Sequence, residues 1–215
     1  MSAARIYLDY NATAPVKPEV VALVAETMST VGNASSVHTA GRTARSRIEK
    51  ARAQVASLVR TVPECVTFTS GGTEANNQAL ASAGSPALTS AIEHESVLRA
   101  AGDLPPIGVD GQGLIDLNAL DAAIETQTPA MISVMLANNE TGVIQPIADV
   151  AARAAERGIL VHVDAVQAAG KLPVDMSELG ADFLCLSAHK FGGPQGIGAL
   201  ITRPGLDPRP LMKGG

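Results

Sequence analysis

Asp182-Phe-Leu-Cys-Leu186, followed at once by Ser187-Ala-His-Lys190-Phe-Gly-Gly-Pro-Gln-Gly196, is the stretch of sequence that decides the fold. Its first part is β-rich and mostly apolar, which is typical of a strand buried on both faces. A lysine at the end of such a strand is unusual, because burying an ammonium group is costly. Burial lowers the pKa of a lysine amine, so that the neutral amine can attack a carbonyl group, as Schiff-base lysines do. The alternative is a surface lysine in an ordinary loop, and this stretch alone does not separate the two.

Outward from this stretch, short β-rich runs alternate with helical patterns from residue 66 onward. The pattern predicts strands over residues 66–69, 87–90, 106–109, 131–136, 160–163, 183–186 and 199–202, with helices over 74–83, 95–101, 117–125 and 147–157. This alternation indicates an α/β fold, with a seven-stranded, mostly parallel sheet and helices on both faces. The last strand follows Lys190 after a turn too short for a helical crossover, so we expect it to be antiparallel.

The N-terminal part reads as a short extended arm, residues 1–15, followed by two helices. Pro18 suits the first turn of the first helix. Its apolar positions recur at helical spacing, as do those of the second helix. They are Val20, Val21, Val24 and Met28 in the first, and Ala44, Ile48, Ala51, Val55 and Leu58 in the second.

Composition limits the class of protein. The chain has 215 residues, enough for one large domain or for one domain and part of another. A net charge of −5 with no basic run argues against nucleic acid and an anionic membrane as partners. Two cysteines, Cys65 and Cys185, indicate a reducing compartment rather than a disulfide framework. With no long apolar stretch and no signal-peptide pattern, we expect a soluble cytoplasmic protein.

Polar residues follow four of the expected strands, where ligands gather in open α/β sheets. Thr69-Ser-Gly-Gly-Thr-Glu-Ala-Asn-Asn77 joins a strand to a helix through two glycines, which suits a phosphate, with the Thr73 hydroxyl as a further contact. His94 follows the next strand, and Ala137-Asn-Asn-Glu-Thr-Gly142 follows a third. Each has a plain alternative: a capped turn, a structural histidine, or a loop that uses asparagine to accept left-handed geometry.

The fourth strand runs into His162-Val-Asp-Ala-Val-Gln167. An aspartate at the end of a buried strand needs a positive partner to stay ionised, so Asp164 indicates a positively charged partner. A metal held by His162, Asp164 and His189 is one alternative, because residues two apart on a strand share a face. No cysteine or further histidine and glutamate cluster completes such a site, so no metal is expected.

One ligand accounts for all four strand ends. A phosphate cradle, an imidazole that can stack on a ring, an aspartate for a pyridinium nitrogen and a Schiff-base lysine together describe a pyridoxal phosphate site. Asp164 would keep the ring nitrogen protonated, so that the ring can accept electrons as a substrate bond breaks.

Five motifs then resemble, in order, those of the cysteine desulfurases, which are class-V, fold-type I pyridoxal phosphate enzymes. They are Tyr7-Leu-Asp-Tyr-Asn-Ala-Thr-Ala-Pro15, Ser70-Gly-Gly-Thr-Glu-Ala-Asn-Asn77, Asn138-Asn-Glu-Thr-Gly142, His162-Val-Asp-Ala-Val-Gln167 and Ser187-Ala-His-Lys190. The resemblance runs over the whole chain and is closest to the group that supplies iron–sulfur cluster assembly. It implies that residues 16–215 are the cofactor-binding large domain and that the arm packs with a small domain that is missing here.

The resemblance also implies roles for individual residues. Lys190 would be linked covalently to the cofactor, Asp164 would bond the pyridine nitrogen, and Gln167 the ring hydroxyl. His94 would stack on the ring and move protons. The other positions would hold the phosphate or the substrate: Thr73, Ser187 and His189 the phosphate, next to the cofactor-binding Gly72, and Asn139 the substrate carboxylate or the ring oxygen.

The implied reaction converts L-cysteine to L-alanine and passes sulfur to an enzyme cysteine as a persulfide. The implied partners are a second copy of the chain and an iron–sulfur scaffold or another sulfur-acceptor protein. Family members are roughly twice as long, so the persulfide cysteine and the substrate-binding arginine are expected beyond Gly215. The alternatives are another class-V enzyme, such as a selenocysteine lyase or an aminotransferase, and a non-catalytic cofactor-binding or dimerisation fragment.

Overall fold

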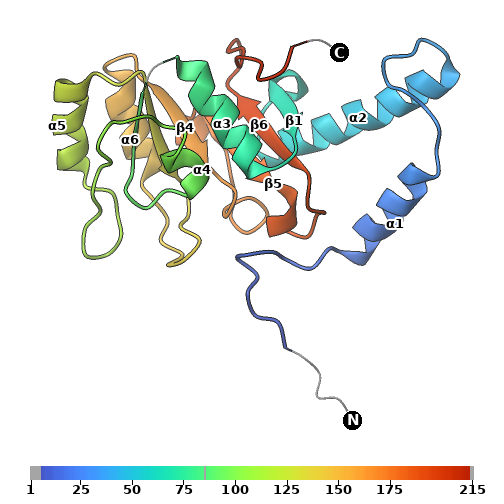
Figure 1. Ribbon diagram of the computed structural model, residues 1–215, viewed down its shortest axis with the longest axis horizontal. Coiled ribbons are helices and arrows are strands. Elements are labelled where there is room, and N and C mark those ends of the chain that lie inside the picture. Colours follow the sequence, from blue (N-terminus) through green and yellow to red (C-terminus); the bar gives the residue numbers. More distant parts are fainter. Residues whose placement is uncertain (1–5, 85, 214–215) are drawn as a thin grey trace.

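A single mixed sheet is the centre of the structure, a computed structural model that describes residues 6–84 and 86–213 (Figure 1). Its strands are β1 (Val66–Thr69), β2 (Ala87–Thr89), β3 (Met131–Met135), β4 (Leu160–Asp164), β5 (Phe183–Ser187) and β6 (Gly198–Thr202), in the spatial order β1-β6-β5-β4-β3-β2. β2 to β5 pair in parallel, whereas β6 is antiparallel to both β5 and β1. The predicted α/β fold and its one antiparallel strand are confirmed.

The predicted seventh strand, over residues 106–109, is wrong. Ile107 makes one isolated parallel bridge to Ser90, and Val109 one antiparallel bridge to Ile115. Pro105 precedes this segment and Pro106 is its first residue, and a proline has no N–H to donate to a sheet ladder. Within the described residues the sheet therefore has six strands.

The helices are α1 (Pro18–Met28), α2 (Thr39–Leu58), α3 (Gly72–Ala83), α4 (Glu95–Leu98), α5 (Leu117–Gln127), α6 (Ile147–Ala155) and α7 (Met176–Leu179), with short 3₁₀ turns η1 (Pro63–Cys65) and η2 (Ala188–Lys190). Every predicted helix is present, with shifted ends. α3 begins at Gly72 rather than at residue 74, and α4 ends at Leu98 rather than at residue 101.

Two layers of apolar side chains hold the helices to the sheet. On one face, Ala75 and Ala79 of α3 pack with Val97 of α4 and with buried strand residues such as Phe183. On the other face, the C-terminal end of α2 and helices α5, α6 and α7 pack against Val161, Val163 and Leu184. All five residues of β3, β5 and β6 are buried, so the central strands have helices on both faces, as their continuous apolar sequence predicts.

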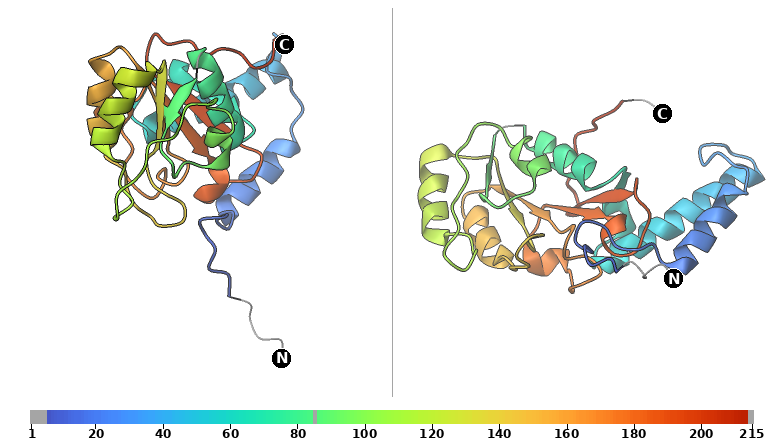
Figure 2. Two further views of the ribbon diagram at one scale, coloured as in Figure 1. Left: turned by 60° about the vertical axis from the view of Figure 1, so that its left-hand side comes forward. Right: turned by 60° about the horizontal axis from the view of Figure 1, so that its bottom comes forward.

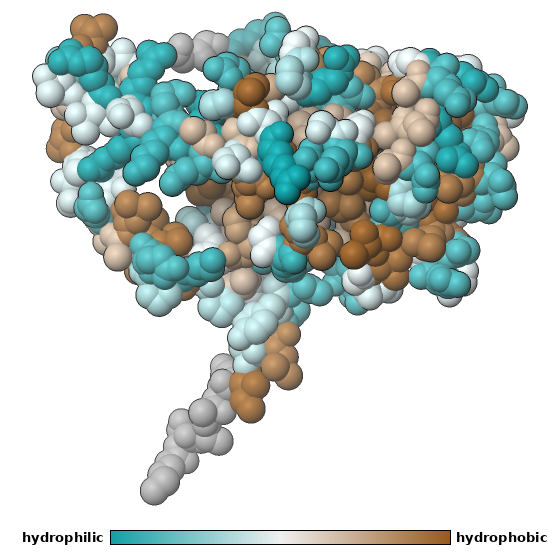
Figure 3. Space-filling model, turned by 180° about the vertical axis from the view of Figure 1, so that it is seen from behind, coloured by the Kyte–Doolittle hydropathy of each residue, from teal (hydrophilic) through white to brown (hydrophobic). Residues whose placement is uncertain are grey.

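The apolar face of α1 is not buried against the described residues. None of its residues is buried, and Val24 and Met28 are 39% and 82% exposed. Helices α1 and α2 project from one side of the sheet (Figure 2), so most of their length has no layer to pack against. Several side chains of α1 are exposed apolar ones, namely Val21, Leu23, Val24 and Met28, and on this side of the molecule separate apolar residues lie among hydrophilic ones (Figure 3). In the described part of the chain, no helix is both long enough and apolar enough to cross a membrane.

Candidate functional site

A cavity of about 540 Å³ lies at the carboxyl ends of β3, β4 and β5. All nine residues predicted to form the site line it: Gly72, Thr73, His94, Asn139, Asp164, Gln167, Ser187, His189 and Lys190. The parallel strands explain this convergence, because their carboxyl ends share one edge of the sheet. Asp164 is the last residue of β4 and Ser187 the last of β5, and η2 carries the chain from Ser187 to Lys190.

Asp164 is the most deeply placed carboxylate of the cavity, at 5% exposure. One of its oxygens, Oδ1, accepts a hydrogen bond from the backbone N–H of Val166 at 2.9 Å, and Oδ2 accepts one from Asn76 Nδ2 at 2.7 Å. Burial raises the pKa of Asp164, while these two bonds and the neighbouring His94 and Lys190 act in the opposite direction. A cationic group bound at this carboxylate would favour its ionised form.

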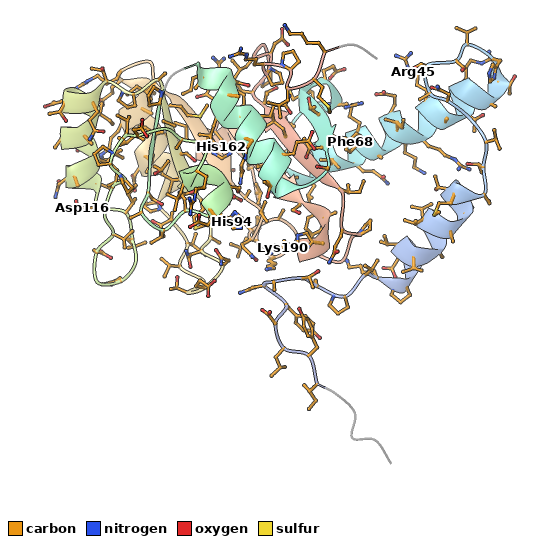
Figure 4. All side chains as sticks on the ribbon, in the orientation of Figure 1. Arg45, Phe68, His94, Asp116, His162 and Lys190 are labelled. Atoms are coloured by element: carbon orange, nitrogen blue, oxygen red, sulfur yellow. The ribbon has the colours of Figure 1, made fainter. Side chains whose placement is uncertain are left out.

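Lys190 lies half-buried at the end of η2 and shares the lower edge of the sheet with His94 (Figure 4). Its Nζ donates hydrogen bonds to the backbone oxygens of Asn11 at 2.8 Å and Ala12 at 2.9 Å. Burial lowers the pKa of Lys190, and the positive charge of Lys171 lowers it further. Both effects increase the fraction of neutral amine, which is the form that attacks a carbonyl group.

The N-terminus of α3 forms the wall of the cavity that suits an anion. The first amides of a helix have no partner within it, and the helix dipole is positive there. Gly72 allows the close fit at this point, because a Cβ on it would lie 2.8 Å from Cγ2 of Val166. Thr73, Ser187 and His189 add polar side chains to the same cavity. Nδ1 of His189 lies 3.2 Å from Oγ1 of Thr13, which ties the N-terminal arm to this wall.

His94 connects to Asp164 through two residues that the sequence did not single out. The backbone N–H of Ser96 donates to Nδ1 of His94 at 3.1 Å, and Ser96 Oγ lies 2.8 Å from the same nitrogen. Asn76 Nδ2 donates both to Ser96 Oγ at 2.9 Å and to Asp164 Oδ2. Asn76 lies one turn into α3, four residues after Gly72, so the two residues share a face of the helix. This spacing was the signal in the sequence that could have indicated that Asn76 faces the cavity.

His162 does not belong to the cavity. It is fully buried within the sheet, with Nδ1 2.7 Å from Ser133 Oγ and Nε2 3.2 Å from Cys185 Sγ. Burial lowers its pKa to about 3, so the ring is neutral. The alternative of a metal held by His162, Asp164 and His189 is therefore not supported, since both ring nitrogens have other partners. Among the residues that the structure describes, no group of three or more histidine, cysteine or acidic side chains could hold a metal ion.

Glu93 is a second buried carboxyl beside the cavity, at 6% exposure, and sequence reasoning missed it. Its Oε1 accepts hydrogen bonds from the backbone N–H of Met135 at 2.8 Å and from the Ser90 hydroxyl. Oε2 is buried and has no partner among the described residues. Burial raises the pKa of Glu93 to about 8, and the charge of Asp164 adds to this effect. Glu93 is thus a neutral acid at pH 7 that joins the ends of β2 and β3.

The neutral state of Glu93 predicts a pH dependence of stability. Its folded pKa of about 8 lies above the ordinary value of 4.5, so its contribution to stability is full at low pH and is lost as pH rises through 8. In the full-length protein, we expect roughly 2–3 kcal/mol of unfolding free energy to be lost between pH 6 and pH 9 through this group. Glu93→Gln should remove this loss in urea unfolding.

Glu95→Gln is the matched control for that measurement. Glu95 is exposed and bonds to Arg99, so Glu95→Gln makes the same carboxyl-to-amide substitution at the surface, away from the buried position. We expect this variant to keep the wild-type slope of stability against pH. A Glu93→Gln variant with the same slope as wild type would show that Glu93 is ionised in the folded protein.

Comparison with known proteins places this geometry in a family. The family described as aminotransferase class-V matches residues 6–215. The cysteine desulfurase IscS of Dictyoglomus turgidum is 42% identical, over 98% of this chain and 57% of that protein. A cysteine desulfurase of Sinorhizobium fredii is 44% identical, over 98% of this chain and 58% of that protein.

Solved structures agree with the sequence relatives. The NifS-like protein of Rickettsia africae superposes with a TM-score of 0.92 at 36% identity, over 98% of this chain and 61% of that one. A structure described as SspA in complex with cysteine has the same TM-score at 33% identity, over 97% of this chain and 65% of that one. The chain thus spans less than two thirds of the length of these proteins. Since the family match extends over nearly all of its residues, the chain belongs to the aminotransferase class-V family.

Proposed function

We propose that the full-length protein is a pyridoxal phosphate-dependent cysteine desulfurase, which converts L-cysteine to L-alanine and transfers the sulfur to an enzyme cysteine as a persulfide. The observation that carries this proposal is the cavity shared by the Lys190 amine and the Asp164 carboxylate, in a chain 42–44% identical to cysteine desulfurases. Membership of the class-V aminotransferase family implies a pyridoxal phosphate-dependent enzyme.

The chemistry of the cavity fits that cofactor. Lys190 Nζ and Gln167 Nε2 both donate to a single oxygen, the backbone oxygen of Asn11, each at 2.8 Å. Two donors that converge on one oxygen suit a ring hydroxyl beside a lysine-linked carbon. Asp164 would bond the ring nitrogen. The helix end at Gly72 and Thr73 would hold the phosphate together with Ser187 and His189.

When bound, pyridoxal phosphate supplies an electron sink for the bonds of an amino acid attached to it. The chain supplies the proton-carrying groups. Nδ1 of His94 accepts the Ser96 N–H, so in the neutral ring the proton lies on Nε2. We infer that His94 would stack on the ring of the bound cofactor and would move protons through Nε2. Lys190 would bind the cofactor and, once displaced by substrate, serve as a base, because its lowered pKa favours the neutral amine.

Asn139 is the residue proposed to contact the substrate. Asn139 lines the cavity and its Nδ2 donates to Glu140 Oε1 at 2.8 Å, so rotation of its side chain would present the amide to a substrate carboxylate or to the ring oxygen.

We infer that residues 16–215 are the large domain and that the arm, residues 1–15, packs with a small domain. We further propose that the protein forms a homodimer and passes sulfur to an iron–sulfur scaffold or another sulfur acceptor. We also propose a cytoplasmic location, which the two free, buried cysteines support.

The deciding experiment offers the full-length protein L-cysteine and L-selenocysteine and measures alanine, sulfide and selenide. Alanine release from cysteine with persulfide on the enzyme supports the desulfurase. Release from selenocysteine alone would indicate a selenocysteine lyase, and amino-group exchange with a keto acid an aminotransferase. Cofactor binding without any turnover would favour a non-catalytic binding or dimerisation role.

Neither Cys65 nor Cys185 suits the role of sulfur acceptor, which gives a further prediction. Cys185 is fully buried, and burial raises the pKa of its thiol well above the usual value, so the reactive thiolate is disfavoured. Cys65 is buried in η1 at the amino end of β1, whereas the cavity lies at the carboxyl ends of the strands. The length of β1, about 13 Å, separates the two. Direct sulfur transfer needs near-contact distance.

We therefore expect Cys65→Ser and Cys185→Ser to leave persulfide formation by the full-length protein within about twofold of wild type. The 215-residue chain, even when folded and loaded with cofactor, should form no persulfide and release no alanine at a meaningful rate. Mass spectrometry of the cysteine-treated protein locates the persulfide. Finding it on Cys65 or Cys185 would refute this prediction.

A further inference from the structure

Lys171 makes a cluster of contacts beside the cavity that the proposed reaction does not use. Its Nζ donates to Gln167 Oε1 at 2.7 Å and to Asn11 Oδ1 at 3.1 Å. Gln167 Nε2 in turn donates to the backbone oxygen of Asn11 at 2.8 Å. Lys171 thus touches the residue predicted to bond the ring hydroxyl without lining the cavity itself.

The contact with Lys171 fixes which end of the Gln167 amide faces the cavity. A side-chain amide has a donor end and an acceptor end of nearly equal shape, so its partners decide its orientation. An ammonium group can only donate, and it therefore selects the oxygen Oε1. The nitrogen Nε2 is then turned the other way, toward the oxygen of Asn11, which is also the oxygen that Lys190 Nζ contacts.

The charge of Lys171 also affects Lys190, by lowering the pKa of its amine. Lys171 lowers the pKa of Lys190, second only to burial, while the carboxylates of Asp164 and Asp9 raise it. His189, the other titratable neighbour, itself has a pKa lowered by burial and by the charge of Lys190. Lys171 is thus the cation in this group that lowers the pKa of Lys190.

We propose that Lys171 is a positioning residue that holds the Gln167 amide with its N–H side toward Lys190, so that the site accepts a ring bearing an oxygen anion next to its lysine-linked carbon. This inference rests on the proposed function. The inference adds to the proposed function the residue, Lys171, that decides whether Gln167 presents a donor or an acceptor to the ring oxygen.

Reversing the charge at position 171 gives the sharpest test. In Lys171→Glu, the new carboxylate can only accept, so it selects Nε2 of Gln167 and turns Oε1 toward the cavity. An acceptor would then face the ring oxygen and repel it. We expect pyridoxal phosphate to bind the full-length variant at least about tenfold more weakly, because a charge-assisted hydrogen bond is replaced by repulsion.

Two further variants separate orientation from simple loss of a contact. Lys171→Met removes the selection without reversing it, so we expect a smaller loss of binding. Because it also removes a positive charge, it should raise the pH midpoint of the colour change of lysine-bound pyridoxal phosphate by about half a unit or more. Lys171→Arg keeps a pure donor and should restore both quantities to near the wild-type values.

Lys50→Glu is the control, since it makes the same charge reversal on an exposed lysine of α2, outside the residues that line the cavity. It should leave the dissociation constant and the midpoint unchanged. Asn11→Ala tests whether Lys171 acts only by tying down the N-terminal arm. If that variant reproduces the full effect of Lys171→Glu, the inference is overturned.

The outcomes distinguish this inference from the proposed function. Wild-type protein in which borohydride leaves Lys190 unlabelled by the cofactor would overturn both. Normal labelling of wild type, with unchanged cofactor dissociation constants and midpoints in Lys171→Glu and Lys171→Met, would overturn the role of Lys171 alone. Weaker binding with a raised midpoint in these two variants, and recovery in Lys171→Arg, supports it.

Discussion

Borohydride reduction of the full-length protein loaded with pyridoxal phosphate is expected to leave the pyridoxyl group on Lys190. This lysine is half-buried in the cavity, and burial together with Lys171 lowers its pKa, so it is more nucleophilic at neutral pH than a surface lysine. Lys190→Ala should lower turnover of cysteine by a factor of about a thousand or more, because it removes both the covalent attachment and the base. Peptide mapping and a kinetic assay measure the two effects.

Lys17 and Lys50 serve as internal controls, because both are exposed lysines of the same chain that do not line the cavity. Neither should carry more than background label. Label on another lysine, with Lys190 unmodified, would refute the assignment. Retention of bound cofactor by the Lys190→Ala variant, as measured by absorbance at equilibrium, would not contradict the assignment of Lys190. Asp164 and the N-terminus of α3 would still hold the ring and the phosphate.

Asp164→Asn is expected to spare much of the cofactor binding and to lower turnover severely, by several kcal/mol of barrier or about a thousandfold. The carboxylate would hold the positive charge on the ring nitrogen, and a neutral amide cannot. The fold should survive the change. Asn76 has a buried Oδ1 without a partner in the described residues, and rotation of its amide would present that oxygen to the new N–H donors.

Asp149→Asn, an exposed position in the first turn of α6, is the matched control with the same change of charge. It should keep wild-type turnover. Thermal unfolding of Asp164→Asn tests the argument about Asn76, since a melting temperature near the wild-type value shows that the amide is accommodated. Unchanged turnover in Asp164→Asn, with cofactor bound, would contradict the role proposed for this carboxylate.

The sequence by itself determined the sheet and the edge at which the candidate site lies. Continuous apolar runs such as Phe183–Ser187 require helices on both faces, and alternation with helices requires parallel strands, so polar residues at strand ends must converge. The same reasoning placed Asp164, Ser187 and Lys190 together. It failed at residues 106–109, where the β-rich pattern outweighed the two prolines that prevent a ladder.

The tertiary structure alone decided which polar groups touch. Asn76 and Ser96 join His94 to Asp164, although Asn76 and Asp164 are 88 positions apart in the sequence. Glu93 is buried because β3 lies beside it, where it accepts a hydrogen bond from the backbone of Met135. The carbonyl of Asn11 meets Lys190 and Gln167 only because residues 11–14 pass beside the cavity. Sequence periodicity reports which face of a strand or helix is apolar. It carries no information on hydrogen bonds between segments far apart in the chain, which depend on how the packed layers bring individual donors and acceptors together.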